Sequence, residues 1–110
     1  MDIIFANKKL EKYGNNFSLA QKKLGSIRAT KYHQRLGDIR DADNFADLEF
    51  LPGHFHSLTA NRNGQWSCSL DQPYRLIFES ADNPIPYNEH GIPILTKMKI
   101  VEIIEIVDYH

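Results

Sequence analysis

The sequence predicts an α+β fold, in which helices pack on one face of an antiparallel β-sheet. Three observations lead to this prediction. A short β-branched and aromatic run opens the chain, apolar residues at helical spacing follow to about position 50, and after Gly53 apolar and polar residues alternate as in strands. The length of 110 residues suits one hydrophobic core, so we expect a single domain over residues 1–110.

The first half of the chain is predicted to hold one strand and three helices. Asn7 and Ser18 can cap two of the helices, because their side-chain oxygens accept hydrogen bonds from free backbone amides. The run Gly14-Asn15-Asn16 is expected to end the first helix, and Pro52-Gly53 to end the third. The predicted ranges are 2–6 for the strand and 8–13, 19–40 and 43–50 for the helices.

The second half is predicted to be a β-meander followed by one long strand. Turn-forming compositions at 61–64 and 71–73 separate three short alternating segments, which is typical of antiparallel strands joined in sequence. The stretch 81–95 contains three prolines and is expected to be a long loop. Residues 97–108 are rich in Ile and Val, so they should form a strand in the middle of the sheet. The three alternating segments are 55–58, 65–70 and 74–80.

Charge is divided unevenly along the chain, although the net formal charge is only −1. Residues 1–40 hold nine Lys/Arg against three Asp/Glu, a local charge of +6, and residues 41–110 hold four against eleven, a local charge of −7. The basic half is either a solvated helical face or an electrostatic footprint for phosphate groups.

Cysteine usage and hydropathy indicate a cytoplasmic protein without a membrane partner. The single cysteine, Cys68, excludes an internal disulfide and favours a reducing compartment, and its alternating strand predicts a place in the core. The early apolar run at 3–5 is too short for a signal peptide or a membrane span.

Strand alternation places Arg75 on the open face of the predicted sheet. Along the strand 74–80, Leu76 and Phe78 share the face expected to contact the helices, whereas Arg75 and Glu79 point the other way. An arginine on an open face is well suited to hold a phosphate, because its planar fork can bond two oxygens. A surface salt bridge is the alternative interpretation.

Histidines and the end of the chain supply further candidates for chemistry. His54 and His56 share one strand face, but further ligands at zinc-binding spacing are lacking, so we expect no metal site and no cofactor. The triplet Asp108-Tyr109-His110 follows a strongly apolar strand that should dock it against the sheet. The alternative is a frayed polar tail. His56 is expected to matter only if it lies near this terminus.

These residues together resemble the HigB-type toxins of the RelE/ParE superfamily. The resemblance covers residues 53–80 and 97–110, and the helical half is similar in layout only. It is carried by His56, by Asn-Arg-Asn-Gly-Gln-Trp-Ser at 61–67, by Tyr-Arg-Leu-Ile-Phe at 74–78, and by the closing Asp-Tyr-His at 108–110. The family often has lysine in place of Thr59 and Gly-Asp in place of Ala60-Asn61, and it is commonly more basic than this chain.

The resemblance implies a RelE-like fold and a set of site residues. By position, it implies catalytic roles for His56, Arg75, Asp108, Tyr109 and His110, and RNA-binding roles for Thr59 and Arg62. The implied activity is metal-independent cleavage of mRNA in the ribosomal A site, by attack of the substrate's own 2′-OH. The two histidines would divide the acid and base roles, in an order that the residues leave open.

The resemblance also implies partners. These are an antitoxin with a helix-turn-helix, the ribosome and its mRNA, and operator DNA only through the antitoxin complex. Two other functions stay open: a ParE-like inhibitor of DNA gyrase without catalysis, and a degenerate member kept as an antitoxin-binding or operator-regulating subunit. A gyrase inhibitor has no need of the terminal Asp-Tyr-His, so this triplet argues against the first alternative. The second alternative is supported by Thr59 and by the acidic residues 41–110.

Overall fold

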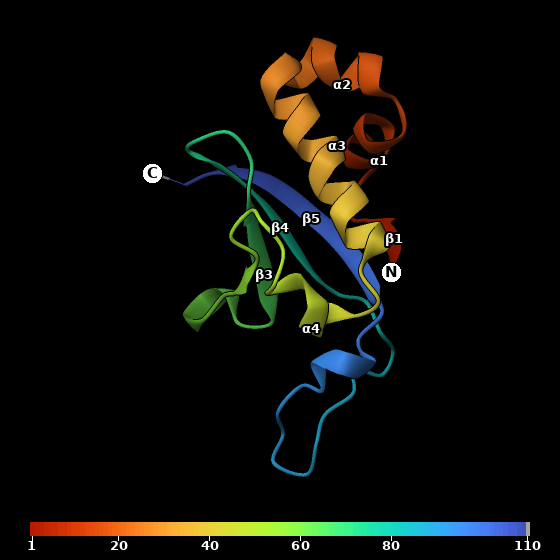
Figure 1. The fold of residues 1–110 in the computed structure, drawn as a ribbon, viewed down its shortest axis with the longest axis vertical. Coiled ribbons are helices and arrows are strands. Elements are labelled where there is room, and N and C mark those ends of the chain that lie inside the picture. Colours follow the sequence, from red (N-terminus) through yellow and green to blue (C-terminus); the bar gives the residue numbers. More distant parts are fainter. Residues whose placement is uncertain (110) are drawn as a thin grey trace.

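A five-stranded β-sheet forms the framework of the computed structural model, which describes residues 1–109 (Figure 1). The strands are β1 (Asp2–Phe5), β2 (His56–Ser57), β3 (Gln65–Ser69), β4 (Tyr74–Ser80) and β5 (Ile100–Asp108). They lie in the order β1-β5-β4-β3-β2. The sheet is antiparallel from β2 to β5, as expected, and parallel where β1 joins β5, so it is mixed. β5 is the inner strand that the Ile- and Val-rich segment predicts.

Helices precede the meander, which confirms the α+β class. The helices within residues 1–109 are α1 (Lys8–Asn15), α2 (Phe17–Leu24), α3 (Ser26–Asp41) and α4 (Phe45–Leu48), with short 3₁₀ turns η1 (Ala60–Arg62) and η2 (Leu95–Lys97). The Asn7 side chain caps α1 as predicted, through a 2.9 Å bond from the Leu10 amide. In the described part of the chain, no helix has both the length and the apolar character needed to cross a bilayer.

The predicted long helix over 19–40 is divided in two. Asn16, and not Ser18, caps its first part, by accepting a 3.1 Å bond from the Leu19 amide. Gly25 then interrupts the helix with a positive φ of 85°. Glycine adopts this conformation readily because it has no Cβ, so α2 ends and α3 begins at this residue.

The helices pack on one face of the sheet, as predicted. Figure 1 shows α1, α2 and α3 grouped together, with α3 running down toward β1 and β5. Alternation within β4 directs Leu76 and Phe78 into the core, whereas Arg75 and Glu79 face the other side. The buried core is formed by side chains from both layers, among them Leu10, Tyr32, Leu36, Ile39, Phe45, Leu48, Trp66, Cys68, Leu76, Phe78, Val101 and Ile103.

The predicted loop after β4 is confirmed and extends away from the sheet (Figure 1). Asp82 anchors its start to the beginning of β5, because its carboxylate accepts bonds from the Lys99 and Ile100 amides. Partial burial acts to raise the pKa of Asp82, but these bonds and one from the Ser80 hydroxyl lower it below its ordinary value. The loop is thus fixed at its base and carries exposed apolar side chains, Tyr87 and Ile92, further out.

Candidate functional site

The face of the sheet opposite the helices, called here the open face, carries the predicted site residues His56 and Arg75. Cross-strand pairing aligns Ser69 with Arg75 and Val107, and Ser67 with Ile77 and Glu105. Residues paired in this way project their side chains on the same side of a sheet. The open face is formed by His56, Gln65, Ser67, Ser69, Arg75, Ile77, Glu79, Glu102, Glu105 and Val107.

Arg75 lies near one end of the open face and is held in place. Its Nη1 donates a 3.2 Å hydrogen bond to the Ser69 hydroxyl, and its Cζ lies 6.0 Å from the centroid of the Tyr109 ring. One guanidinium nitrogen is thus engaged, and the side chain remains partly exposed. Arg75 is therefore positioned to bind an anion beside an exposed aromatic ring.

The hydroxyl, the amide and the carbonyl of Ser69 are all hydrogen-bonded, and a residue of α3 provides one of these bonds. Its amide donates to the Gly53 carbonyl at 2.8 Å, and its carbonyl accepts from Arg35 Nε at 2.8 Å. Arg35 is buried, with an ion pair to Asp38 at 3.6 Å. A Cβ on Gly53 would lie 2.6 Å from Arg35 Cζ, so only glycine leaves room for this guanidinium.

Sequence reasoning did not find this support for Arg75. The available signal was the position of Arg35 on the apolar face of its helix, between Tyr32 and Leu36, both of which are buried. A buried arginine is almost always paired, so such a position indicates an acceptor in the neighbouring layer. The acceptor itself depends on tertiary packing.

Arg62 lies across the middle of the open face. Its Nη1 donates to Gln65 Oε1 and its Nη2 to Glu105 Oε1, both at 2.9 Å. Gln65 in turn donates to Glu79 at 3.3 Å. The predicted RNA-binding arginine is therefore on the same face as Arg75, where an acidic strand residue neutralises it.

The end of the described chain is docked against the β3–β4 turn. The Tyr109 amide donates to the Pro73 carbonyl at 3.0 Å, which continues the ladder beyond β5 and brings the ring to Arg75. Asp108 is paired with Tyr74, whose side chain faces the helices, so alternation directs Asp108 away from the open face. The third member of the triplet, His110, lies outside the described residues.

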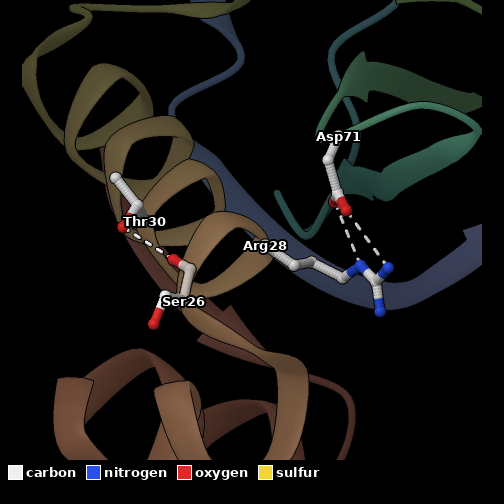
Figure 2. Close-up of polar contacts among 4 residues, drawn as sticks. All are labelled: Ser26, Arg28, Thr30 and Asp71. Carbon is white, nitrogen blue, oxygen red and sulfur yellow. Dashed lines mark hydrogen bonds and ion pairs between the residues drawn. The ribbon is translucent and has the colours of Figure 1, made fainter.

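A clamp from α3 holds this same turn. Figure 2 shows Arg28 reaching from α3 to Asp71. Its Nε donates to one carboxylate oxygen at 3.0 Å and its Nη2 to the other at 3.1 Å. The Arg28 Cζ also lies 3.4 Å from the centroid of the Tyr74 ring. The clamp therefore connects the helical layer to the turn that carries Tyr109.

His56 lies at a distance from the terminus. It lies on β2, where it pairs with Ser67 of β3. Its side chain is exposed, and its Nδ1 forms a 2.7 Å hydrogen bond with the His54 carbonyl. Three inter-strand spacings separate β2 from β5, roughly 14 Å across the sheet. The structure does not bring His56 beside Tyr109, so these residues could reach one substrate only from opposite sides of Arg75.

Thr59 and Cys68 are also apart from Arg75. Thr59 is exposed and lines a cavity of about 470 Å³ beside the loop at 81–95, with Trp66 and Met98 among its other walls. Cys68 is buried in the core as predicted, and burial raises the pKa of its thiol to about 12. A thiol with such a pKa is not a nucleophile at neutral pH.

No family model matches the chain, and no curated protein matches it. The chemistry that the open face can perform follows from its geometry. Arg75, backed by Ser69, can stabilise negative charge, Tyr109 can stack on a base, and His56 can exchange protons.

Proposed function

We propose that this chain is a toxin of a type II toxin–antitoxin system, a metal-independent endoribonuclease that cuts mRNA on the ribosome. One observation carries the proposal: Arg75 stands on the face that the helices leave uncovered, bonded to Ser69 and facing the Tyr109 ring. An anion site beside an exposed aromatic ring suits a single-stranded nucleotide, whose phosphate and base are held separately. The resemblance to HigB-type toxins of the RelE/ParE superfamily agrees with this proposal.

The proposed reaction uses the 2′-OH of the substrate as its nucleophile. The 2′-oxygen bonds to the adjacent phosphorus, the bond from phosphorus to the 5′-oxygen breaks, and the products are a 2′,3′-cyclic phosphate and a 5′-OH. A base removes the 2′-OH proton and an acid protonates the 5′-oxygen. His56 and His110 divide these two roles, and Arg75 balances the charge on the pentacovalent phosphorus.

The other proposed roles follow from position. Tyr109 stacks on a base next to the cleaved bond. Asp108, which the strand directs toward the helices, orients the terminus and does not contact the phosphate. Arg62 binds the RNA backbone, and Thr59, at the neighbouring cavity, contacts RNA beyond the cleaved nucleotides.

The proposed partners are the ribosome with its mRNA and a helix-turn-helix antitoxin. The antitoxin also provides contact with operator DNA. The local charge of +6 over residues 1–40 favours acidic antitoxin segments on the helical layer.

Removal of Tyr109 and His110 tests the proposal. The truncated protein should no longer cleave mRNA on translating ribosomes, and its Tm should change little because Tyr109 is exposed. His110→Gln should have nearly the same effect, since glutamine cannot transfer a proton at neutral pH. Lys97→Ala is the matched control, because it removes an exposed side chain from η2, before β5 begins. Product ends are mapped in a purified translation system.

Unchanged cleavage by the truncated protein would overturn the proposed mechanism. Loss of DNA supercoiling by gyrase, without RNA cleavage by the intact chain, would instead favour the gyrase-inhibiting function. Both assays use the same purified protein, so their results can be compared directly.

A further inference from the structure

Ser67 has a buried hydroxyl without a hydrogen-bond partner in the described part of the chain. The residue is only 1% exposed. Within residues 1–109, its Oγ is the buried side-chain nitrogen or oxygen atom that has no hydrogen-bond partner. Buried hydroxyls are nearly always hydrogen-bonded, and each exception needs an explanation. Ser67 is on the open face, two residues before Ser69, so its hydroxyl points to the proposed RNA side.

Helices α1 to α4 pack on the other face of the sheet, so they do not bury Ser67. Ile77, opposite Ser67, is fully buried yet does not belong to the helix-packed core. The guanidinium of Arg62 bonds to Gln65 on β3 and to Glu105 on β5, so it spans β4, which lies between those strands. Arg62 therefore covers the pair formed by Ser67 and Ile77.

Arg62 can exchange its ion pair with Glu105 for a bond to another anion. The side chains of Arg62 and Glu105 are 33% and 42% exposed, and ion pairs at such exposure contribute little to stability. Glu105 engages only Nη2 of this guanidinium, whereas Nη1 is bonded to the neutral Gln65. A phosphate can bind both nitrogens with two charged oxygens, so it gives Arg62 a second charged contact. An RNA backbone can therefore draw Arg62 away from Glu105.

We propose that the Arg62–Glu105 ion pair is a resting contact that closes a second phosphate subsite, in which Arg62 and the Ser67 hydroxyl bind the RNA backbone. This inference rests on the proposed ribonuclease function. Ser67 and Ser69 are two residues apart on one strand, about 6.8 Å. That separation is on the scale of neighbouring phosphates in a single strand. One phosphate then lies at Arg75 and Ser69, and the next at Arg62 and Ser67, where the hydroxyl gains its missing partner.

Glu105→Gln tests the resting contact. A single-stranded oligoribonucleotide with a 2′-deoxy sugar at the cleaved position is the probe, so that binding is measured without turnover. Glu105→Gln should tighten binding about two- to fivefold, which corresponds to the strength of a partly exposed ion pair. Glu102→Gln is the matched control, because it removes the same charge from the same strand and face but lies opposite Glu79. Arg62→Ala should abolish the gain from Glu105→Gln.

Ser67→Ala tests the hydroxyl. It should weaken oligonucleotide binding about ten- to hundredfold, the effect of one lost hydrogen bond to a charged group. Its Tm should stay equal or rise, because the variant removes a buried polar atom that has no partner in the fold. A purely structural serine would give the opposite result, a lower Tm with unchanged binding. Ser57→Ala, on β2 and paired with Trp66, is the matched control.

The outcomes separate the subsite from the ribonuclease activity. If Glu105→Gln binds the oligonucleotide no more tightly than Glu102→Gln, or if Ser67→Ala lowers only the Tm, the subsite is refuted even where cleavage is intact. If the wild-type chain neither binds nor cuts RNA, the proposed function fails, and titration with inorganic phosphate decides the subsite. Tighter phosphate binding by Glu105→Gln than by Arg62→Ala would then support the second phosphate subsite, and equal binding by the two variants would refute the subsite.

Discussion

Ser69 connects the two layers of the protein through one residue. Its carbonyl binds an arginine from the helical side, and its hydroxyl binds another from the open face. Each of these bonds involves a charged donor, which makes it stronger than a neutral hydrogen bond. The orientation of Arg75 therefore depends on packing beneath the sheet as well as on groups at the surface.

If the proposed function holds, Arg75→Ala should lower the rate of RNA cleavage by about 10²–10³-fold, because it removes the donor proposed to balance charge in the transition state. Stability should fall by less than about 1 kcal/mol, since a partly exposed arginine packs little and water can replace its bond to Ser69. Arg75→Lys should be intermediate, because lysine keeps the charge but lacks the fork. Single-turnover cleavage and urea denaturation measure the two effects. Full activity of Arg75→Ala would exclude the phosphate-binding role.

Gly53→Ala should destabilise the fold and also reduce activity. The new Cβ would approach the buried Arg35 guanidinium to 2.6 Å, and φ at this position is 112°. Backbone strain of this kind costs about 1–3 kcal/mol, and displacement of Arg35 adds to it. Gly91→Ala is the control, since Gly91 also has a positive φ, 74°, but nothing lies near its added Cβ. Equal destabilisation of the two variants, measured in urea, would mean that Arg35 is not displaced.

At the scale of elements, the β3–β4 turn carries the end of β5. Arg28 holds the turn through Asp71 and Tyr74, and the turn holds Tyr109 through the Pro73 carbonyl. A contact made by α3 is in this way transmitted to an exposed residue of the site. The turn is the point at which the sheet, the helical layer and the chain terminus meet.

Arg28→Ala should increase hydrogen exchange at the Tyr109 amide and lower cleavage, while Arg75 keeps its bond to Ser69. The cost in stability should be about 1 kcal/mol, because the ion pair is bidentate but partly exposed. Arg28→Lys should recover only part of the protection, since lysine makes neither the paired bonds nor the same stacking. Lys23→Ala, at the exposed end of α2, serves as the control. If exchange at Tyr109 stays at the wild-type rate, the turn does not hold the terminus.

Local patterns in the sequence were sufficient to predict most elements. Alternation identified β3 and β4 and gave the correct face for Arg75, because the two-residue period of a strand is a local property. The break at Gly25 was missed, since a glycine is often tolerated within a helix and its φ depends on the packing of its neighbours. The parallel pairing of β1 with β5 joins segments about a hundred residues apart, and neither segment alone specifies its partner.

The candidate site was predictable only in part, for the same reason. Arg75 and Tyr109 were found from their places on and after strands, and the structure brings them together. The supporting bonds from Arg35, and the neutralisation of Arg62 by Glu105, depend on which elements become neighbours. Sequence patterns indicated which residues have useful chemistry, but not which of them are engaged.

On the scale of the whole molecule, the uneven charge separates two surfaces. The basic residues are concentrated in α1 to α3, whereas Glu79, Glu102 and Glu105 lie on the open face around the proposed RNA site. These glutamates oppose the approach of RNA, so binding there depends on close contacts and not on long-range attraction. The helical layer is correspondingly the better surface for an acidic partner.

Lys22→Glu combined with Lys23→Glu should weaken binding of the proposed antitoxin and leave the proposed RNA cleavage by the free protein unchanged. Both lysines are exposed in the last turn of α2, on the helical layer. Wild-type affinity for the antitoxin should fall as ionic strength rises, and the double variant should show a weaker dependence. Binding of the co-expressed antitoxin is measured by calorimetry at several salt concentrations. A double variant that loses cleavage but keeps the antitoxin would reverse the assignment of the two surfaces.

The inner position of β5 has a consequence for synthesis of the chain. β1 is made first and β5 last among the strands, yet β1 pairs with β5 and no other strand. While a ribosome is still adding residues, the helices and the β2–β4 hairpins can form, but β1 must wait for its partner. The complete sheet, and with it the pairing of Arg75 with Tyr109, can assemble only after the last strand leaves the ribosome. The contact between Arg75 and Tyr109 is therefore among the last to form during synthesis.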